Sequence, residues 1–158
     1  MVRGGFGLLE TAVPFTEFCS EVQPKLRHAF AARFGEVDGA DATAEALAYA
    51  WEHWERVRAM DNPAGYLYRV GASKTRRIRR ATPLLVALPS DGLPDIEPGL
   101  PTAIADLSEK QRVSVVLVTG FGWQLAAVAE LLDVSVSTVQ NHVDRGLKNL
   151  RKKLGAES

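Results

Sequence analysis

Residues 123–154 have the sequence WQLAAVAELLDVSVSTVQNHVDRGLKNLRKKL, and this stretch decides the fold of the C-terminal part of the chain. Its apolar and small residues recur at helical spacing on either side of a tight turn at residues 133–135. Ser137 and Thr138 are predicted to cap the second helix. Two helices joined by so short a turn are typical of a helix-turn-helix motif. An ordinary helical hairpin with a basic end is the alternative.

Glycine is the usual residue at the turn of such a motif, and Asp133 stands there instead. Aspartate tolerates the left-handed backbone conformation at some cost, so we expect the motif to survive.

A helix-turn-helix places the N-terminal part of its second helix in the major groove of DNA. Glutamine and asparagine side chains there can pair with adenine, and an arginine can pair with guanine. Basic residues farther along the helix would attract phosphates whatever the base sequence. We therefore expect DNA contacts from Ser137, Thr138, Gln140, Asn141, Arg145 and Lys148.

The N-terminal half is predicted to form amphipathic helices. After a loose lead-in at residues 1–12, apolar residues recur at helical spacing from Phe15 to Phe34, with a kink or a break at Pro24. A turn over residues 35–41 and a second helix over about 42–57 follow. Asn62 and Pro63 then give an N-cap and a first-turn proline, which predict a third helix reaching about Arg80.

The charges are balanced overall but unevenly placed. The chain has 19 basic and 19 acidic residues, yet residues 66–81 hold six cations and no acid. On the predicted third helix, Arg69, Arg76 and Arg80 share one strip, while Lys74 lies on the apolar side, where its stem could snorkel. This strip predicts contact with a polyanion, and a merely solvated basic face is the alternative.

A change of composition divides the chain into two modules. Residues 82–101 contain five prolines, which is typical of a linker. Beyond it, Ser108 and Gln111 form a capping box that favours a helix over a strand at the β-branched run of residues 113–118. The sequence therefore predicts an all-α fold with helical domains at 13–81 and 101–156, joined by a flexible linker at 82–100.

Several classes of function have no support in the residues. Cys19 is the single cysteine and is predicted to be a buried thiol, so no internal disulfide or multi-cysteine zinc site is expected. The three histidines are scattered, and no nucleophile–base pair or phosphate loop is present. We therefore expect no enzyme activity, no cofactor and no metal. The sequence has no membrane-spanning run or signal peptide, which predicts a cytoplasmic protein without membrane insertion.

The order of the parts resembles the extracytoplasmic-function sigma factors of bacterial RNA polymerase, which belong to the sigma-70 family. The resemblance covers about residues 15–155. Residues 41–51 (DATAEALAYAW) look like the family's region 2.2, and residues 62–70 (NPAGYLYRV) are similar to its regions 2.3 and 2.4. Residues 107–112 (LSEKQR) resemble the opening of region 4, and residues 138–147 (TVQNHVDRGL) its reader of the −35 promoter element.

The resemblance implies a role for each module. The C-terminal helix-turn-helix would bind the −35 element. The N-terminal module would bind and melt the −10 element, with a flipped base held by the loop at residues 58–62. The −10 contacts implied are Asn62, Tyr66, Arg69, Lys74, Arg76, Arg77 and Arg80.

The resemblance also implies protein partners, namely the clamp helices and flap of core RNA polymerase and an anti-sigma factor. Asp41, Glu45, Leu47 and Trp51 would contact the polymerase, although Trp51 could be a simple core residue. The resemblance thus predicts a sigma factor that directs promoter-specific transcription initiation. The alternative is a stand-alone helix-turn-helix regulator that binds duplex DNA as a dimer.

Overall fold

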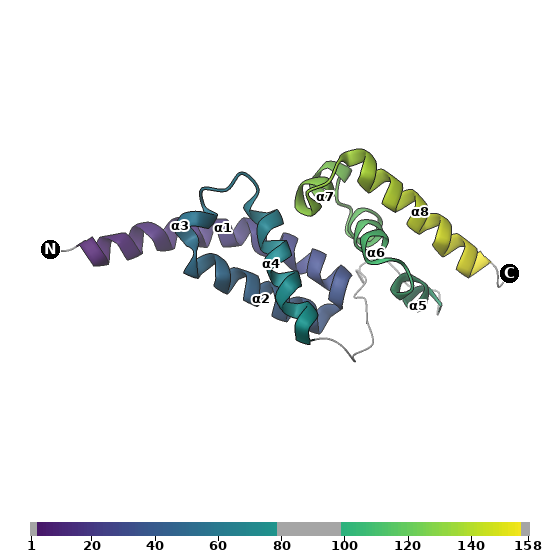
Figure 1. Ribbon diagram of the computed structural model, residues 1–158, viewed down its shortest axis with the longest axis horizontal. Coiled ribbons are helices and arrows are strands. Elements are labelled where there is room, and N and C mark those ends of the chain that lie inside the picture. Colours follow the sequence, from purple (N-terminus) through teal and green to yellow (C-terminus); the bar gives the residue numbers. More distant parts are fainter. Residues whose placement is uncertain (1–2, 79–98, 156–158) are drawn as a thin grey trace.

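The chain folds into two helical modules that lie side by side (Figure 1). The structure is a computed structural model that describes residues 3–78 and 99–155, with side chains described for 14–75 and 99–155. No strand occurs within the two described stretches, so the prediction of an all-α fold is confirmed. Residues 79–98 lie outside the described residues. They include Arg80 and most of the predicted linker.

The N-terminal module contains α1 (Arg3–Phe34), α2 (Glu36–Glu52), α3 (Trp54–Val57) and α4 (Pro63–Ile78). Helix α1 packs along α2, and α4 contacts both. The fully buried side chains at the centre of this module are Leu26, Phe30, Val57 and Leu67. The backbones of α1 and α2 come close at Gly39, where a Cβ atom would lie 2.7 Å from the backbone nitrogen of Ala31.

The structure corrects four predictions in this module. Residues 3–12 are helical and not a loose lead-in, and α1 continues through Pro24 as one helix and not as two. The predicted turn at residues 35–41 shrinks to Gly35, whose φ of 89° ends α1, and α2 begins at Glu36. The predicted helix over 42–57 is two helices, because α2 ends at Glu52 and α3 begins at Trp54.

The C-terminal module contains α5 (Leu100–Ala105), α6 (Glu109–Val115), a π-helical turn η1 (Val116–Gly120), α7 (Leu125–Leu132) and α8 (Val136–Gly155). The Ser108 cap is confirmed, because its Oγ accepts a hydrogen bond from the Gln111 backbone N–H at 3.3 Å. Residues 113–118 are helical, as predicted. Helix α5 was not predicted, because Pro101 ends the proline-rich stretch that is typical of a linker; proline nevertheless suits the first turn of a helix.

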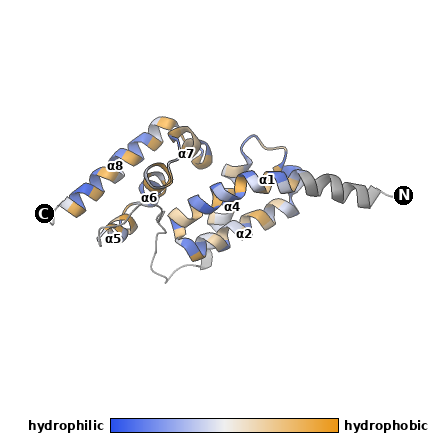
Figure 2. Ribbon diagram, turned by 180° about the vertical axis from the view of Figure 1, so that it is seen from behind, coloured by the Kyte–Doolittle hydropathy of each residue, from blue (hydrophilic) through white to orange (hydrophobic). Residues whose placement is uncertain are grey.

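Helix α8 packs on the other helices of the C-terminal module. Val139, Val143 and Leu150 are buried, and a Cβ atom at Gly146 would lie 2.5 Å from Cγ2 of Val115 on α6. Figure 2 shows hydrophilic and apolar residues alternating along α8, as expected of an amphipathic helix. In the part of the chain that the structure describes, no helix is long and apolar enough to span a membrane.

Candidate nucleic-acid interface

Helices α7 and α8 form the helix-turn-helix that the sequence predicts. Asp133 at the turn has a φ of 56° and a ψ of 49°, so it occupies the left-handed conformation expected at this position. The cap of α8 is Ser135, not Ser137 and Thr138 as predicted. Its Oγ accepts a hydrogen bond from the Thr138 backbone N–H at 3.1 Å. The recognition helix therefore begins two to three residues earlier than the sequence suggested, and Ser137 and Thr138 lie in its first turn.

The predicted DNA contacts on α8 share one accessible face. Thr138 is half-buried, and the others, Ser137, Gln140, Asn141, Arg145 and Lys148, are exposed. The side chain of Gln140 donates a hydrogen bond to Asp144 at 2.8 Å, which fixes the orientation of its amide. These residues form a polar and cationic surface that is open to a ligand.

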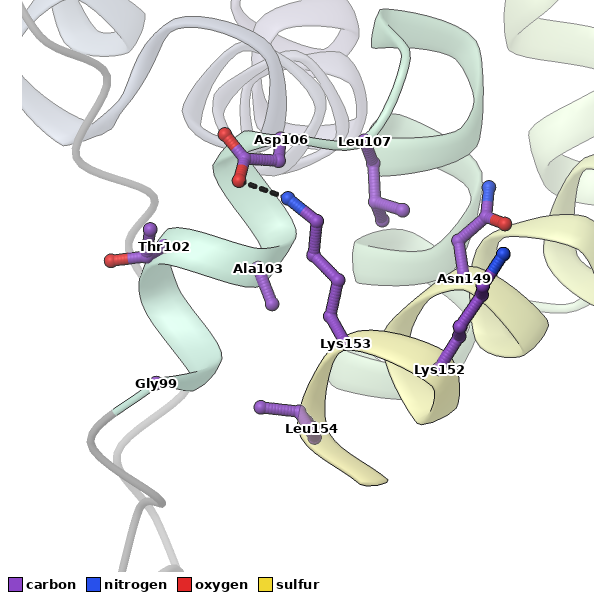
Figure 3. Close-up of a pocket in the computed structure, with 9 residues that line it drawn as sticks. All are labelled: Gly99, Thr102, Ala103, Asp106, Leu107, Asn149, Lys152, Lys153 and Leu154. Atoms are coloured by element: carbon purple, nitrogen blue, oxygen red, sulfur yellow. Dashed lines mark hydrogen bonds and ion pairs between the residues drawn. The ribbon is translucent and has the colours of Figure 1, made fainter. Parts of the chain in front are cut away.

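The basic end of α8 faces a groove between α8 and α5, with a volume of about 830 Å³ (Figure 3). Lys152 and Lys153 line it, and Lys153 forms an ion pair with Asp106. Because Lys153 is already paired within the module, it is a weaker candidate for phosphate contact than the exposed Lys148 or Arg151.

The predicted −10 residues lie along α4, from its N-cap onward. The Oδ1 atom of Asn62 accepts a hydrogen bond from the Gly65 backbone N–H at 3.1 Å, which confirms the predicted N-cap. Tyr66 is half-buried and Arg69 is exposed. Lys74 faces α2, as predicted for a snorkelling side chain: its Nζ lies 3.5 Å from Glu45 and 5.6 Å from the centre of the Tyr49 ring, and about half of its side chain is exposed. The side chains of Arg76 and Arg77, and all of Arg80, lie outside the described residues.

A cluster of aromatic and basic side chains beside Tyr66 was missed by the sequence analysis. The hydroxyls of Tyr49 and Tyr66 lie 3.0 Å apart, and the Arg56 guanidinium donates to both, at 2.8 Å to Tyr66. The Tyr49 ring stacks on His53 with centroids 4.1 Å apart. We call Tyr49, His53, Arg56 and Tyr66 the tyrosine cluster. Residues 49, 53 and 56 recur at the spacing of one face of the helix predicted over 42–57, and this was the signal that could have found the cluster.

The predicted polymerase-binding residues lie on α2. Asp41 and Glu45 are exposed, Leu47 is half-buried, and Trp51 has 43% of its surface exposed. The ring of Trp51 lies 5.0 Å from that of Phe15 on α1. Trp51 is therefore not a simple core residue, and this patch combines two acids with an accessible aromatic ring.

The two modules contact each other directly. Arg112 of α6 is buried and donates hydrogen bonds to the backbone oxygens of Ala32 at 3.1 Å and Arg33 at 3.2 Å, both in the last turn of α1. Arg33 forms an ion pair with Glu109. On the other side of this contact, the Asn62 amide donates to the Glu130 backbone oxygen at 2.6 Å, and Arg69 lies 3.6 Å from Asp133.

A histidine completes the contact between the modules. The His28 ring stacks on Phe121 with centroids 4.1 Å apart, and its Nδ1 accepts a hydrogen bond from the Trp123 indole N–H at 3.3 Å. Desolvation by burial, and then the positive charge of Arg27, lower the pKa of His28 below its usual 6.5. The ring is therefore neutral at pH 7, as an acceptor at Nδ1 requires.

The contact between the modules should depend on pH. Because the pKa of His28 is lowered when the modules are together, the contact is fully formed above about pH 6.5 and weakens as the pH falls toward the lowered value. Lys25 and Glu130 are the charged residues that line the cavity beside His28. Distances between spin labels on the two modules, measured from about pH 8 to pH 5, check this. A His28→Phe variant that kept the pH dependence would contradict it.

Groups that could hold a metal ion are absent from the described residues, where no three His, Cys, Asp or Glu side chains come together. Cys19 is half-buried on α1, less than predicted, and burial raises the pKa of its thiol.

Comparison with known proteins supports the resemblance seen in the motifs. Residues 99–150 match the model of the family described as sigma-70, region 4. No curated protein sequence matches the chain.

Two solved structures have a similar fold. One is the sigma factor RpoE from Bartonella quintana, solved in complex with the anti-sigma factor NepR. It is 19% identical, with a TM-score of 0.63 over 92% of this chain and 99% of that chain. The other is CnrH in complex with the cytosolic domain of CnrY, 24% identical, with a TM-score of 0.60 over 91% of this chain and 89% of that chain. The resemblance predicted from the sequence is thus supported: residues 99–150 match the sigma-70 region 4 model, and the chain as a whole has the fold of these two solved structures.

Proposed function

We propose that this chain is an RNA polymerase sigma factor that directs promoter-specific transcription initiation and has no enzymatic activity of its own. The observation that carries the proposal is a region 4 helix-turn-helix with an open polar face, in a chain with the sigma-factor fold. A cytoplasmic location follows, since its partners are core polymerase and promoter DNA.

In this proposal α8 binds the −35 element. Asn141 and Gln140 present amides toward the bases, Arg145 presents a guanidinium, and Lys148 lies one turn farther along for a phosphate. The orientation of Gln140 is set by Asp144, so its amide is preorganised.

The N-terminal module would bind the −10 element as a single strand. The tyrosine cluster adds two half-buried rings and the Arg56 cation to Asn62 and Arg69, the contacts that were predicted from the sequence. Aromatic rings and arginine planes are the groups on which unpaired bases stack. Asp41, Glu45, Leu47 and Trp51 would contact the polymerase clamp helices. An anti-sigma factor, such as the partner in the RpoE structure, is a further proposed ligand.

Two substitutions on α8 should separate base recognition from phosphate attraction. Asn141→Ala is expected to weaken binding to a −35 duplex by about 10-fold and to relax the preference at one base pair, because an amide–adenine pair contributes about 1–3 kcal/mol. Lys148→Ala should weaken binding to all duplexes alike and reduce the slope of log affinity against log salt by about 1. Fluorescence anisotropy over a salt series measures both. A uniform loss for Asn141→Ala would contradict the assignment.

The proposed function is tested by adding the purified chain to core polymerase. We expect run-off transcripts from a defined start site, and gel shifts of promoter DNA that need core polymerase. Tight binding to a palindromic duplex by the chain alone, as a dimer and without any effect of core polymerase, would instead establish a stand-alone helix-turn-helix regulator.

A further inference from the structure

The cavity beside His142 is a candidate ligand site outside the surfaces that the proposed function uses. It has a volume of about 270 Å³, and residues of α1, α4, α6, α7 and α8 line it. Contacts of α1 with α6 and of α4 with α7 bring these helices together. One water takes about 30 Å³ in the liquid, so the cavity has room for a small ion or for a ligand of several atoms.

The charges on the walls of this cavity are mostly positive. Arg33, Arg69 and Lys110 line it, and Glu109 is the one acid among the described residues that do so. Glu109 forms an ion pair with Arg33, and Arg69 lies 3.6 Å from Asp133, which is not among the lining residues. Lys110 is exposed and has no ion-pair partner in the part of the chain that the structure describes. Cations therefore outnumber acids at the cavity, even when Asp133 is counted.

Two buried side chains in the walls have hydrogen-bond donors to spare. The side chain of Arg33 is 9% exposed, and its Nε has no hydrogen-bond partner, although Nη2 pairs with Glu109 and Nη1 donates to the Tyr68 hydroxyl at 3.4 Å. The Tyr68 hydroxyl accepts that bond, and its own proton has no acceptor among the described residues. Burial raises the pKa of Tyr68, so the hydroxyl keeps its proton at neutral pH. Buried donors without an acceptor are rare, because each one costs free energy, and a ligand would satisfy both.

His142 is a further donor, and its charge can report on the cavity. It is half-buried on α8 and lines the cavity together with Lys110. Desolvation by burial, and then the positive charges of Lys110 and Arg145, lower the pKa of His142 below its usual 6.5. An anion beside the ring would favour its charged form and would therefore raise this pKa.

The donors define the chemistry of the ligand. A cation would be repelled, and an apolar ligand would leave the buried donors unpaired. A phosphate monoester presents three strong acceptor oxygens where a carboxylate presents two, and guanidinium and ammonium groups are common binders of phosphate. We propose that this cavity binds the phosphate group of a free small molecule. The groups that hold it are the buried Arg33 Nε and Tyr68 hydroxyl and the more exposed Lys110 and His142.

The DNA backbone is the other source of a phosphate. A duplex can reach the exposed Lys110, but Arg33 and Tyr68 are only 8% and 5% exposed. A small ion can fill the cavity and meet all of the donors. The burial of Arg33 and Tyr68 therefore favours a free ligand over DNA.

Inorganic phosphate is the probe for the first test. It is titrated into the full chain at constant ionic strength, and the ring C–H signals of the three histidines are followed by NMR, with His142 assigned from its loss in His142→Gln. We expect a saturable shift of the His142 signal, and a higher pKa of His142 at saturating phosphate over about pH 5 to pH 8. His28 and His53 do not line the cavity and should not shift. A shift that rises linearly without saturation, or that is equal for all three histidines, would overturn the proposal.

Two variants separate a built site from general attraction of anions. Lys110→Gln should weaken phosphate binding by about 10-fold, because it removes a charged donor. Tyr68→Phe should weaken it several-fold without changing the net charge. Lys25→Gln is the matched control: it removes the same charge from an exposed position beside the other cavity and should leave the affinity unchanged. Equal losses in Lys110→Gln and Lys25→Gln would overturn the proposal, and Lys110 is exposed, so its substitution should not disturb folding.

Binding of the −35 duplex in phosphate-free buffer distinguishes the two sources of phosphate. Tyr68→Phe should bind the duplex as the wild type does. A loss of duplex affinity in Tyr68→Phe would assign the cavity to the DNA backbone and overturn the free ligand. The phosphate titration needs neither DNA nor core polymerase, so a failure of the proposed function would leave the phosphate site standing.

Discussion

Phe30→Ala is expected to lower the free energy of unfolding of the N-terminal module by about 3–5 kcal/mol, which is the largest loss of stability that we predict for a single side chain. Phe30 has no exposed surface, and its ring stacks on Tyr68 with centroids 5.2 Å apart. It also fills the gap at Gly71 of α4, where a Cβ atom would lie 2.5 Å from the Phe30 ring. Removal of the ring would leave a cavity among α1, α2 and α4.

Chemical unfolding followed by circular dichroism measures this loss. The matched control is Val37→Ala on α2, because Val37 is 77% exposed and its truncation should change stability by no more than about 0.5 kcal/mol. The C-terminal module has its own core around Val113, Leu117 and Val139, so −35 duplex binding should survive in Phe30→Ala. A loss below about 1 kcal/mol would show that the site collapses around the missing ring.

The inward-facing stripe that contains Phe30 was predicted from sequence, because burial of an amphipathic helix leaves a strong periodic pattern. The ends of the helices were less predictable. Proline at position 24 indicated a kink, yet the buried residues on both sides, Val22 and Leu26, keep α1 packed against α2 as one helix. One left-handed glycine, Gly35, is enough to end α1, and the acids that follow it suit the N-terminus of α2.

The contact between the modules could not be predicted from local patterns. Arg112 lies about 80 residues from the carbonyls that it caps, and nothing in the sequence marks those carbonyls as unpaired. The capping-box segment was predicted correctly as the start of a helix. Arg112, however, was identified only as the last residue of the region 4 motif at residues 107–112. Helix periodicity correctly placed Lys74 on the side that faces α2, but not its ion pair with Glu45. Contacts between elements that are distant in sequence decide which partners Arg112 and Lys74 have.

The largest loss of function that we expect from a single site is that of Tyr66→Ala. Tyr66 is half-buried beside the loop at residues 58–62, and its hydroxyl is held by Tyr49 at 3.0 Å and Arg56 at 2.8 Å. A ring so held is oriented before a base arrives, which reduces the entropy lost on stacking. Since stacking contributes about 1–3 kcal/mol per base, promoter melting should fall by about 10- to 100-fold.

Tyr66→Phe separates the ring from its hydroxyl. The phenylalanine ring can still stack on a base but makes no hydrogen bond to Tyr49 or Arg56, so we expect a loss of only a few-fold. Permanganate reactivity of unpaired thymines at the −10 element, with core polymerase present, measures melting for both variants. Binding to the −35 duplex should be equal in the two variants and the wild type, because α8 is unchanged. Only the stacking model predicts that a ring without its hydroxyl is sufficient for melting. If Tyr66→Phe were as defective as Tyr66→Ala, the hydroxyl network and not stacking would therefore be what this residue contributes.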